Sequence, residues 1–207
     1  MNITVGFMDV TVAIPTIPSR RSQLRKAITS VAIQNYPAAG ISVAVDLRGE
    51  GSAATRNRAL AGVQTPWVAF LDDDDQLLAN HLEILIQGAE ETGADVIYGL
   101  PRVIGPDGQP RVRHWQWGGP EKFDAELLRQ SSYITVSSLV RTELAKACGG
   151  FRYQTADDGG AYDDHGFYLN LLDAGATFHH IHEETFIWNH HGMNTSGRPD
   201  KGDALRS

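Results

Sequence analysis

The sequence has one cysteine, no long apolar run and no excess of basic residues. Cys148 alone cannot form an internal disulfide or a cysteine-based zinc site, and it suits a reducing compartment, so we expect a cytoplasmic protein. No segment approaches the roughly 20 apolar residues of a membrane span, and the first ten residues lack the basic region of a secretory signal. The net charge of −7 argues against a nucleic-acid partner.

What is present is an alternation of strand and helix patterns. The chain has 207 residues, enough for one domain with a substantial core. Apolar runs predict strands at residues 10–14, 41–45, 67–71 and 95–98. Apolar stripes of helical spacing predict one helix around residues 24–32 and another from residue 82 to the Gly93 that ends it, and residues 53–61 fit a short helix between them. This order predicts an α/β fold, with a mostly parallel central sheet and helices on both faces.

The second half of the chain is less regular. We expect a hairpin around the turn at residues 106–108, a strand within 133–140, a tight turn at 149–151 and a helix over 163–172. Trp115 and Trp117 lie two residues apart, hence on one face of a strand. They could stack on a sugar ring or simply pack at an edge.

Four consecutive acids, Asp72–Asp75, follow the predicted strand at 67–71. In open α/β sheets, ligands bind at the carboxyl ends of the strands. Two like charges ~5 Å apart repel by roughly 3 kcal/mol at an effective dielectric constant near 20. A divalent cation with oxygen ligands would remove that repulsion. A solvated turn that caps the next helix is the alternative.

Seven segments of the chain together carry a family resemblance. They are VAIPT at 12–16, SV at 30–31 with QNYP at 34–37, ATRN at 54–57, FLDDDD at 70–75, GGF at 149–151, DD at 163–164 and WNHHGMNTS at 188–196. In this order they resemble the landmarks of family 2 glycosyltransferases of the GT-A fold. The resemblance implies metal-assisted transfer of a sugar from a nucleoside-diphosphate donor to an unidentified acceptor, usually with inversion. It also implies one domain, with a nucleotide-sugar half at about 8–100, an acceptor and catalytic half at about 101–196, and a polar tail at 197–207.

The resemblance assigns roles to individual residues. Asp72 and Asp74 match the D-x-D positions that hold Mn²⁺ or Mg²⁺, Asp72 also facing the ribose, and His191 matches a late metal ligand. Oxygen and imidazole ligands suit such an ion. The remaining donor-binding candidates are Pro15, Thr16, Ile17, Arg20, Asp46, Arg56, Asn57 and Asp73. Alternatives without a role in donor binding stay open for three of them. Arg20 could be solvated, Asp46 could be a turn residue, and Arg56 could do no more than pair with the acids.

Asp163 and Asp164 match the family's acidic pair and are candidates for the catalytic base. Residues four, seven and eight positions after Asp164 form an apolar stripe, whereas the same spacing from Asp163 gives a more mixed face. We therefore expect Asp164 to face the cleft and act as the base. The alternative is that both acids cap the helix.

The chain departs from the family pattern in two places. After Asp46 it reads LRGEG in place of a second acid and a Gly-Ser-Asp segment, and the basic residue expected before His191 is absent. The shortened loop, with the lack of the long C-terminal extension of many relatives, keeps open a non-catalytic module that binds sugar or nucleotide, although the retained Asp164 and His191 argue against it. A nucleotidyltransferase is a further alternative, although residues 15–21 lack the glycine-rich phosphate loop typical of that class.

Overall fold

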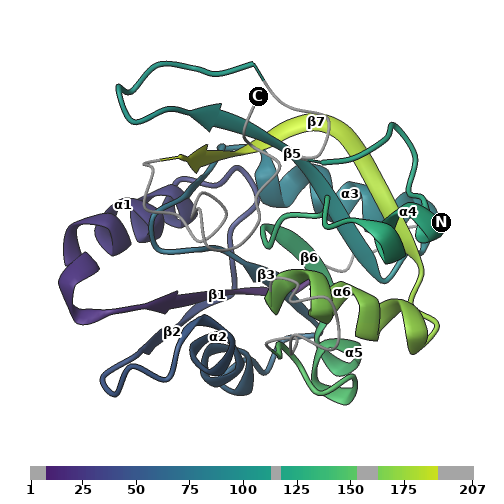
Figure 1. Cartoon of the computed structure of the whole chain (residues 1–207), viewed down its shortest axis with the longest axis horizontal. Helices are drawn as coiled ribbons and strands as arrows, with labels where there is room; N and C mark the ends of the chain where they lie inside the picture. Colours follow the sequence, from purple (N-terminus) through teal and green to yellow (C-terminus); the bar gives the residue numbers. More distant parts are fainter. Residues whose placement is uncertain (1–7, 113–117, 153–162, 191–207) are drawn as a thin grey trace, which may run out of the picture.

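A computed structural model describes residues 8–112, 118–152 and 163–190. Its centre is one seven-stranded sheet with the strand order β2-β1-β3-β6-β5-β7-β4 (Figure 1). The strands are β1 (Val10–Thr16), β2 (Gly40–Val45), β3 (Trp67–Phe70), β4 (Gln76–Leu77), β5 (Val96–Ile104), β6 (Ser138–Arg141) and β7 (Phe178–Asn189). Strands β1, β2, β3, β5 and β7 run in one direction, while β6 and β4 run antiparallel to their neighbours. The sheet is therefore mixed but mostly parallel, as predicted.

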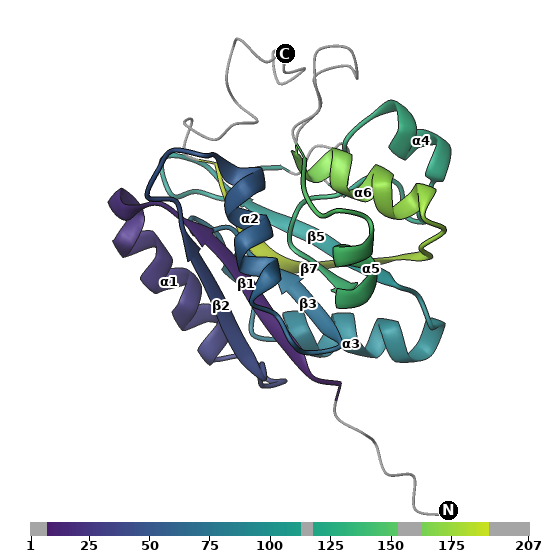
Figure 2. The same cartoon turned by 90° about the horizontal axis from the view of Figure 1, so that it is seen from below.

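Helices cover both faces of this sheet (Figures 1 and 2). They are the short η1 (Pro18–Arg20) and α1 (Arg21–Ala32), α2 (Ser52–Ala61), α3 (His81–Thr92), α4 (Ala125–Gln130), α5 (Thr142–Ala147) and α6 (Asp163–Asp173). Val12 and Ile14 of β1 pack in one core with α1 and α3, whereas Ala13 between them packs in the other with α2, α5 and α6. This alternation follows from the two-residue period of a strand.

The second half differs from the prediction in detail. The expected strand at 133–140 is shortened at its start to β6. At that start the backbone oxygen of Tyr133 accepts from Gly118 N at 2.8 Å instead of from a strand of the sheet, and the Tyr133 hydroxyl donates to Asp124 O at 2.7 Å. β5 is longer than expected and pairs with β7 along most of its length. The turn after β5 closes with Arg111 N donating to Val103 O, and the rest of the predicted hairpin arm, residues 113–117, lies outside the described residues. Trp115 and Trp117 lie outside the described residues.

The parallel strands bring the acidic residues of the first half to the same side of the sheet, where the carboxyl ends of the strands lie. Thr16 ends β1, Asp46 follows β2, and Asp72 lies two residues after β3. The candidate site is built on this side, as expected for a sheet of this type. Among the described residues, no helix combines the length and the apolar character that crossing a membrane would need.

Candidate active site

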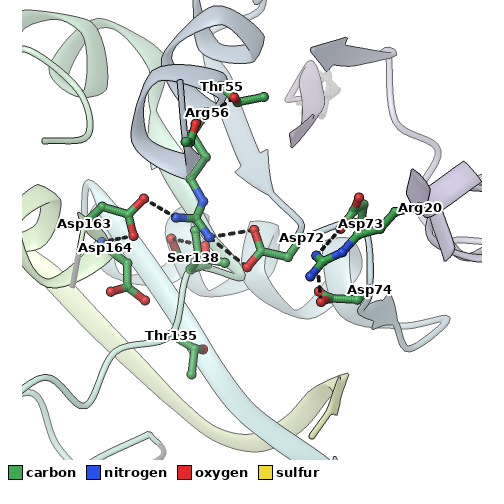
Figure 3. A network of polar contacts seen from close by, with 12 residues as sticks. Arg20, Thr55, Arg56, Asp72, Asp73, Asp74, Thr135, Ser138, Asp163 and Asp164 are labelled. Atoms are coloured by element: carbon green, nitrogen blue, oxygen red, sulfur yellow. Dashed lines mark hydrogen bonds and ion pairs between the residues drawn. The ribbon is translucent and has the colours of Figure 1, made fainter. Parts of the chain in front are cut away.

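One buried guanidinium joins the two acidic segments of the site (Figure 3). Arg56, on α2, donates from Nη2 to both carboxylate oxygens of Asp72, at 2.7 and 2.8 Å. Its Nη1 forms an ion pair with Asp163 at the start of α6. Burial alone would lower the pKa of Arg56, but the charges of Asp72, Asp163 and Asp164 outweigh it and raise the pKa well above its usual value. Arg56 is therefore charged at every working pH.

Aromatic packing sets the position of these three groups. Phe70 at the end of β3, Phe151 after α5 and Phe167 on α6 form one cluster, with ring centroids 4.2 to 5.5 Å apart. The guanidinium carbon of Arg56 lies 5.5 Å from the centroid of the Phe151 ring. Asp72 follows Phe70 by two residues, and Asp163 precedes Phe167 by four. The cluster thus fixes both acids relative to Arg56.

Asn57 has a structural partner rather than a free amide. Its Nδ2 donates to Phe151 O at 2.8 Å, and its Oδ1 accepts from Phe151 N, also at 2.8 Å. Gly150 adopts a φ of +69°, and a Cβ there would lie only 2.2 Å from Asn57 Oδ1. The Gly-Gly-Phe segment is therefore a tight turn, as predicted, and Asn57 holds Phe151 beneath Arg56.

The first loop meets the acidic run through Asp73. Thr16 Oγ1 donates to Asp73 Oδ2 at 2.6 Å, and Arg20 Nη1 lies 2.9 Å from an oxygen of both Asp73 and Asp74. The side chain of Arg20 remains one-third exposed, whereas Asp73 is buried. Arg20 therefore pairs with the acids and still faces solvent at the site. Pro15 lies within β1, and Ile17 is exposed beside η1.

Asp46 shapes the shortened loop after β2. Its Oδ1 accepts from the backbone amides of residues 48, 49 and 50, at 2.8 to 3.1 Å, and its Oδ2 accepts from Gly51 N at 2.8 Å. The amide bonds, with that from Gly51 the strongest, hold the pKa of Asp46 below its usual value. Four of its acceptor positions thus serve the loop, which is the turn role that the sequence left open.

Three carboxylates of the acidic run could hold a metal ion. One oxygen each of Asp72, Asp74 and Asp75 lies within 4.8 Å of the others. Asp75 was not among the predicted ligands, because an acidic run does not reveal which of its members turn towards one point. Burial and the neighbouring charges of Asp74 and Asp72 raise the pKa of Asp75 well above its usual value. A cation at this position would favour its charged form.

The end of β7 lies against this acidic group. Asn189 N donates to Asp75 Oδ1 at 2.9 Å, and Asn189 Nδ2 donates to the backbone oxygen of Asp74 at 2.6 Å. His191, the predicted late ligand, lies outside the described residues, two positions after Asn189. The sheet therefore brings a segment more than a hundred residues away in sequence to the acidic run.

Asp163 and Asp164 differ sharply in environment. Asp163 is buried and paired with Arg56, whereas Asp164 is partly exposed and forms no ion pair with any described side chain. His165 N donates to Asp164 Oδ1 at 2.8 Å. Burial and the charge of Asp163 raise the pKa of Asp164 to about 7 despite Arg56. A carboxylate near neutrality is suited to exchanging protons.

The helical spacing did not separate the two acids as expected. Phe167, Tyr168 and Leu171 are all fully buried, so α6 faces the core over a broad arc that includes both predicted stripes. Asp163, not Asp164, is the more buried of the pair. The difference between them comes from Arg56, which the sequence places 107 residues away.

The family model described as glycosyl transferase family 2 matches residues 25–149. No match was found among the curated proteins. Crystal structures of S. aureus TarS share the fold. Residues 1–349 in complex with UDP-GlcNAc give a TM-score of 0.67 at 16% identity, covering 88% of this chain and 58% of that one.

Other TarS structures give the same result. The 1–349 structure described without a ligand has a TM-score of 0.65 at 17% identity, covering 88% of this chain and 60% of that one. The structure described simply as TarS has the same TM-score and identity, and the chain covers 37% of it. The chain thus spans less than two thirds of these TarS chains. The family match covers more than half of the present sequence, so the chain belongs to glycosyl transferase family 2 and has its GT-A fold.

Proposed function

We propose that the protein transfers a sugar from a nucleoside-diphosphate donor to an acceptor hydroxyl, with a divalent metal and with inversion at the anomeric carbon. One observation carries this proposal: Arg56 joins Asp72 of the acidic run to Asp163, the neighbour of Asp164. The acids suited to the donor and the acid suited to a base therefore belong to one site. Membership of glycosyl transferase family 2 and the UDP-GlcNAc complex of TarS support the same reading.

The acidic run fits a hard divalent cation. Asp72, Asp74 and Asp75 offer carboxylate oxygens, the ligands that Mn²⁺ and Mg²⁺ prefer. Burial and the neighbouring charges of Asp74 and Asp72 raise the pKa of Asp75, and a bound cation would offset that repulsion. We propose His191 as a further ligand, since the end of β7 already bonds this run through Asn189. Such an ion, when bound, would stabilise the charge of the departing diphosphate.

The donor would lie along the carboxyl edge of β1 and β3. Thr16 and Asp73 fix the wall of this region, and the partly exposed guanidinium of Arg20 is available to a phosphate oxygen. Pro15, Ile17 and Asp46 would shape the path of the nucleotide. Arg56 and Asn57 would contribute by holding Asp72 and Phe151 in place.

We assign the base to Asp164. Its carboxylate would accept the proton of the acceptor hydroxyl as that oxygen forms a bond to the anomeric carbon, while the bond from this carbon to the diphosphate oxygen breaks on the opposite face. A pKa of about 7 makes Asp164 a competent base at neutral pH. Asp163 would stay paired with Arg56 and orient the start of α6.

A non-catalytic module that binds nucleotide or sugar is the competing function. The carboxylate of Asp46 favours it to a degree, because it accepts four loop amides and has little capacity left for a nucleotide base. A donor-hydrolysis assay separates the two functions, since a module that only binds would be stabilised by the donor but would not hydrolyse it.

The experiment is a two-step screen of the purified chain. Thermal shift with a panel of UDP-, GDP- and dTDP-sugars, with and without Mn²⁺, identifies the donor, because a ligand that binds the folded state raises its melting temperature. Donor hydrolysis is then followed for the wild type and for Asp164→Asn. We expect metal-dependent binding by both proteins and turnover by the wild type alone. Metal-dependent binding without turnover by either protein would favour the binding module.

A further inference from the structure

The edge strand β2 carries a row of exposed apolar side chains. Among the strands of the described residues, β2 has only β1 as a neighbour. On one face of β2, Ser42 Oγ donates to Ala59 O of α2 at 2.7 Å and Ala44 is buried. On the other face, Ile41, Val43 and Val45 expose 39, 41 and 41% of their surface. One face of this strand is therefore covered by a helix and the other is not.

The exposed row continues a buried core. Ile41 pairs in register with Val12 of β1, and Val43 pairs with Ile14, both of which pack in the core beneath α1 and α3. The apolar surface thus extends from this core outwards to the edge of the sheet. Leu47, which follows β2, is 78% exposed and adds to it.

The backbone of the same residues faces outwards. Asp46 N donates to Thr16 O at 2.8 Å, and on the other side of β1 Leu71 N donates to Ala13 O. Even-numbered residues of β1 therefore face β2. Because ladder bonds alternate along a strand, the N–H and C=O groups of Ile41, Val43 and Val45 point away from β1.

Within the part of the chain that the structure describes, this edge lacks the usual protection against pairing. Monomeric proteins guard their edge strands with lysine, proline, bulges or a covering segment. Residues 38–45 contain no charged residue and no proline. With a net charge of −7 the protein as a whole repels its own copies, so an uncharged edge is where two copies can approach at least electrostatic cost.

We propose that β2 pairs antiparallel with β2 of a second copy, about a two-fold axis at Val43. In this register Ile41 lies opposite the partner's Val45, and Val43 lies opposite the partner's Val43. The outward backbone groups of Ile41 and Val43 then bond across the axis, and Val45 O exchanges its long bond from Arg58 Nη2 (3.4 Å) for one from the partner. The two apolar rows meet on one face. The strand complements itself only in this orientation, and the two-fold closes the assembly as a dimer.

The dimer is expected to be weak. One pair of edge strands with a few flanking side chains lies at the small end of protein interfaces. The association should therefore depend on concentration, and dilution should produce monomers.

Sedimentation velocity of the full chain over a concentration series tests the proposal. Val43→Lys places two positive charges at the axis and should weaken dimerisation by about tenfold or more. Val112→Lys makes the same change at a side chain that is 97% exposed elsewhere, and it should dimerise as the wild type does. Circular dichroism checks that Val43→Lys is folded. Val43→Thr, which keeps the β-branched shape, gives a second, milder variant.

A mixing experiment fixes the register. Val43→Lys and Val43→Glu should each be monomeric alone, and their mixture should recover dimers because opposite charges now meet at the axis. A wild type that stays monomeric at every concentration would overturn the proposal. So would a Val43→Lys variant that dimerises as tightly as the wild type.

Discussion

One terminal nitrogen of Arg56 donates to both carboxylate oxygens of Asp72, and the other forms an ion pair with Asp163. A single side chain of α2 thus links the end of β3 to the start of α6. The two acids come from segments with no other direct bond between them among the described residues. Together with the contact between Phe70 and Phe167, Arg56 therefore sets how far apart the donor side and the base side of the site lie.

Removal of this cation should destabilise the protein strongly. Arg56→Gln leaves two carboxylates in a poorly solvated site without a counter-charge, which we expect to lower the free energy of unfolding by about 3 kcal/mol. Urea denaturation measures the change. Arg102→Gln is the matched control, because its ion pair with Glu184 is nearly half exposed and should be worth less than about 1 kcal/mol. Equal losses for the two variants would contradict the structural role of Arg56.

The Gly-Gly-Phe turn gives a paired prediction. Gly149 and Gly150 both have positive φ, so alanine at either position costs about 1–2 kcal/mol of backbone strain. At Gly150 the added Cβ would also collide with Asn57 Oδ1, whereas at Gly149 it meets nothing within 4 Å. Gly150→Ala should therefore unfold at a clearly lower urea concentration than Gly149→Ala. It should also weaken donor binding, because Phe151 would shift beneath Arg56. Equal urea midpoints for the two variants would show that Asn57 moves aside without a loss of stability.

Metal binding should depend on the acidic run and not on acidity in general. Asp74→Asn removes one of the three converging carboxylates and should abolish Mn²⁺ binding measured by calorimetry, with the fold intact. The loss of one like charge offsets the loss of its contact with Arg20. Asp107→Asn, an exposed acid far from the site in the sequence, should leave the Mn²⁺ affinity unchanged. Unchanged affinity in Asp74→Asn would remove Asp74 from the metal site.

The first half of the fold could be predicted because its signals are local. Buried strands β1 and β3 are short apolar runs, and α1 and α3 have a clear apolar stripe. Their parallel order follows from the alternation of elements. The convergence of Asp72 and Asp74 at one edge then needs only the rule for carboxyl ends of strands.

The second half and the finer site could not be predicted, because they rest on contacts between distant residues. β6 runs antiparallel, and its place between β3 and β5 is decided by the packing of the whole sheet. The pairing of Arg56 with Asp163 and of Asn189 with Asp75 joins residues more than a hundred positions apart. No local pattern encodes such contacts. The structural role of Asn57 was likewise hidden, since its partner is the backbone of Phe151.

The two acids of α6 should separate in a transfer assay. Asp164→Asn should bind donor and metal normally yet lose transfer by about 10²–10⁴-fold, the usual contribution of a positioned base. Asp163→Asn should instead lose stability, because it leaves Arg56 with only Asp72, and should retain more transfer activity where it is folded. The measurement is the transfer rate at saturating donor once an acceptor is known. An active Asp164→Asn with an inactive, folded Asp163→Asn would reverse the assignment.

The raised pKa of Asp164 also predicts how stability depends on pH. In the folded protein this pKa is about 7, whereas in the unfolded chain an aspartate titrates near ~3.9. Between these values the folded state holds a proton that the unfolded state has lost, so the contribution of Asp164 to stability is complete below about pH 4 and declines as the pH rises towards about 7. Asp164→Asn stays neutral and escapes this decline.

At about pH 8 the Asp164→Asn variant should therefore be more stable than the wild type, by at most about 4 kcal/mol, and at about pH 4 the two should be nearly equal. Urea denaturation at both pH values measures the difference. Asp173→Asn, exposed at the other end of α6, serves as the control and should follow the wild type at each pH. If Asp164→Asn differed from the wild type by the same free energy at both pH values, the pKa of Asp164 would not be raised by folding. The assignment of Asp164 as a base with a pKa near neutrality would then be wrong.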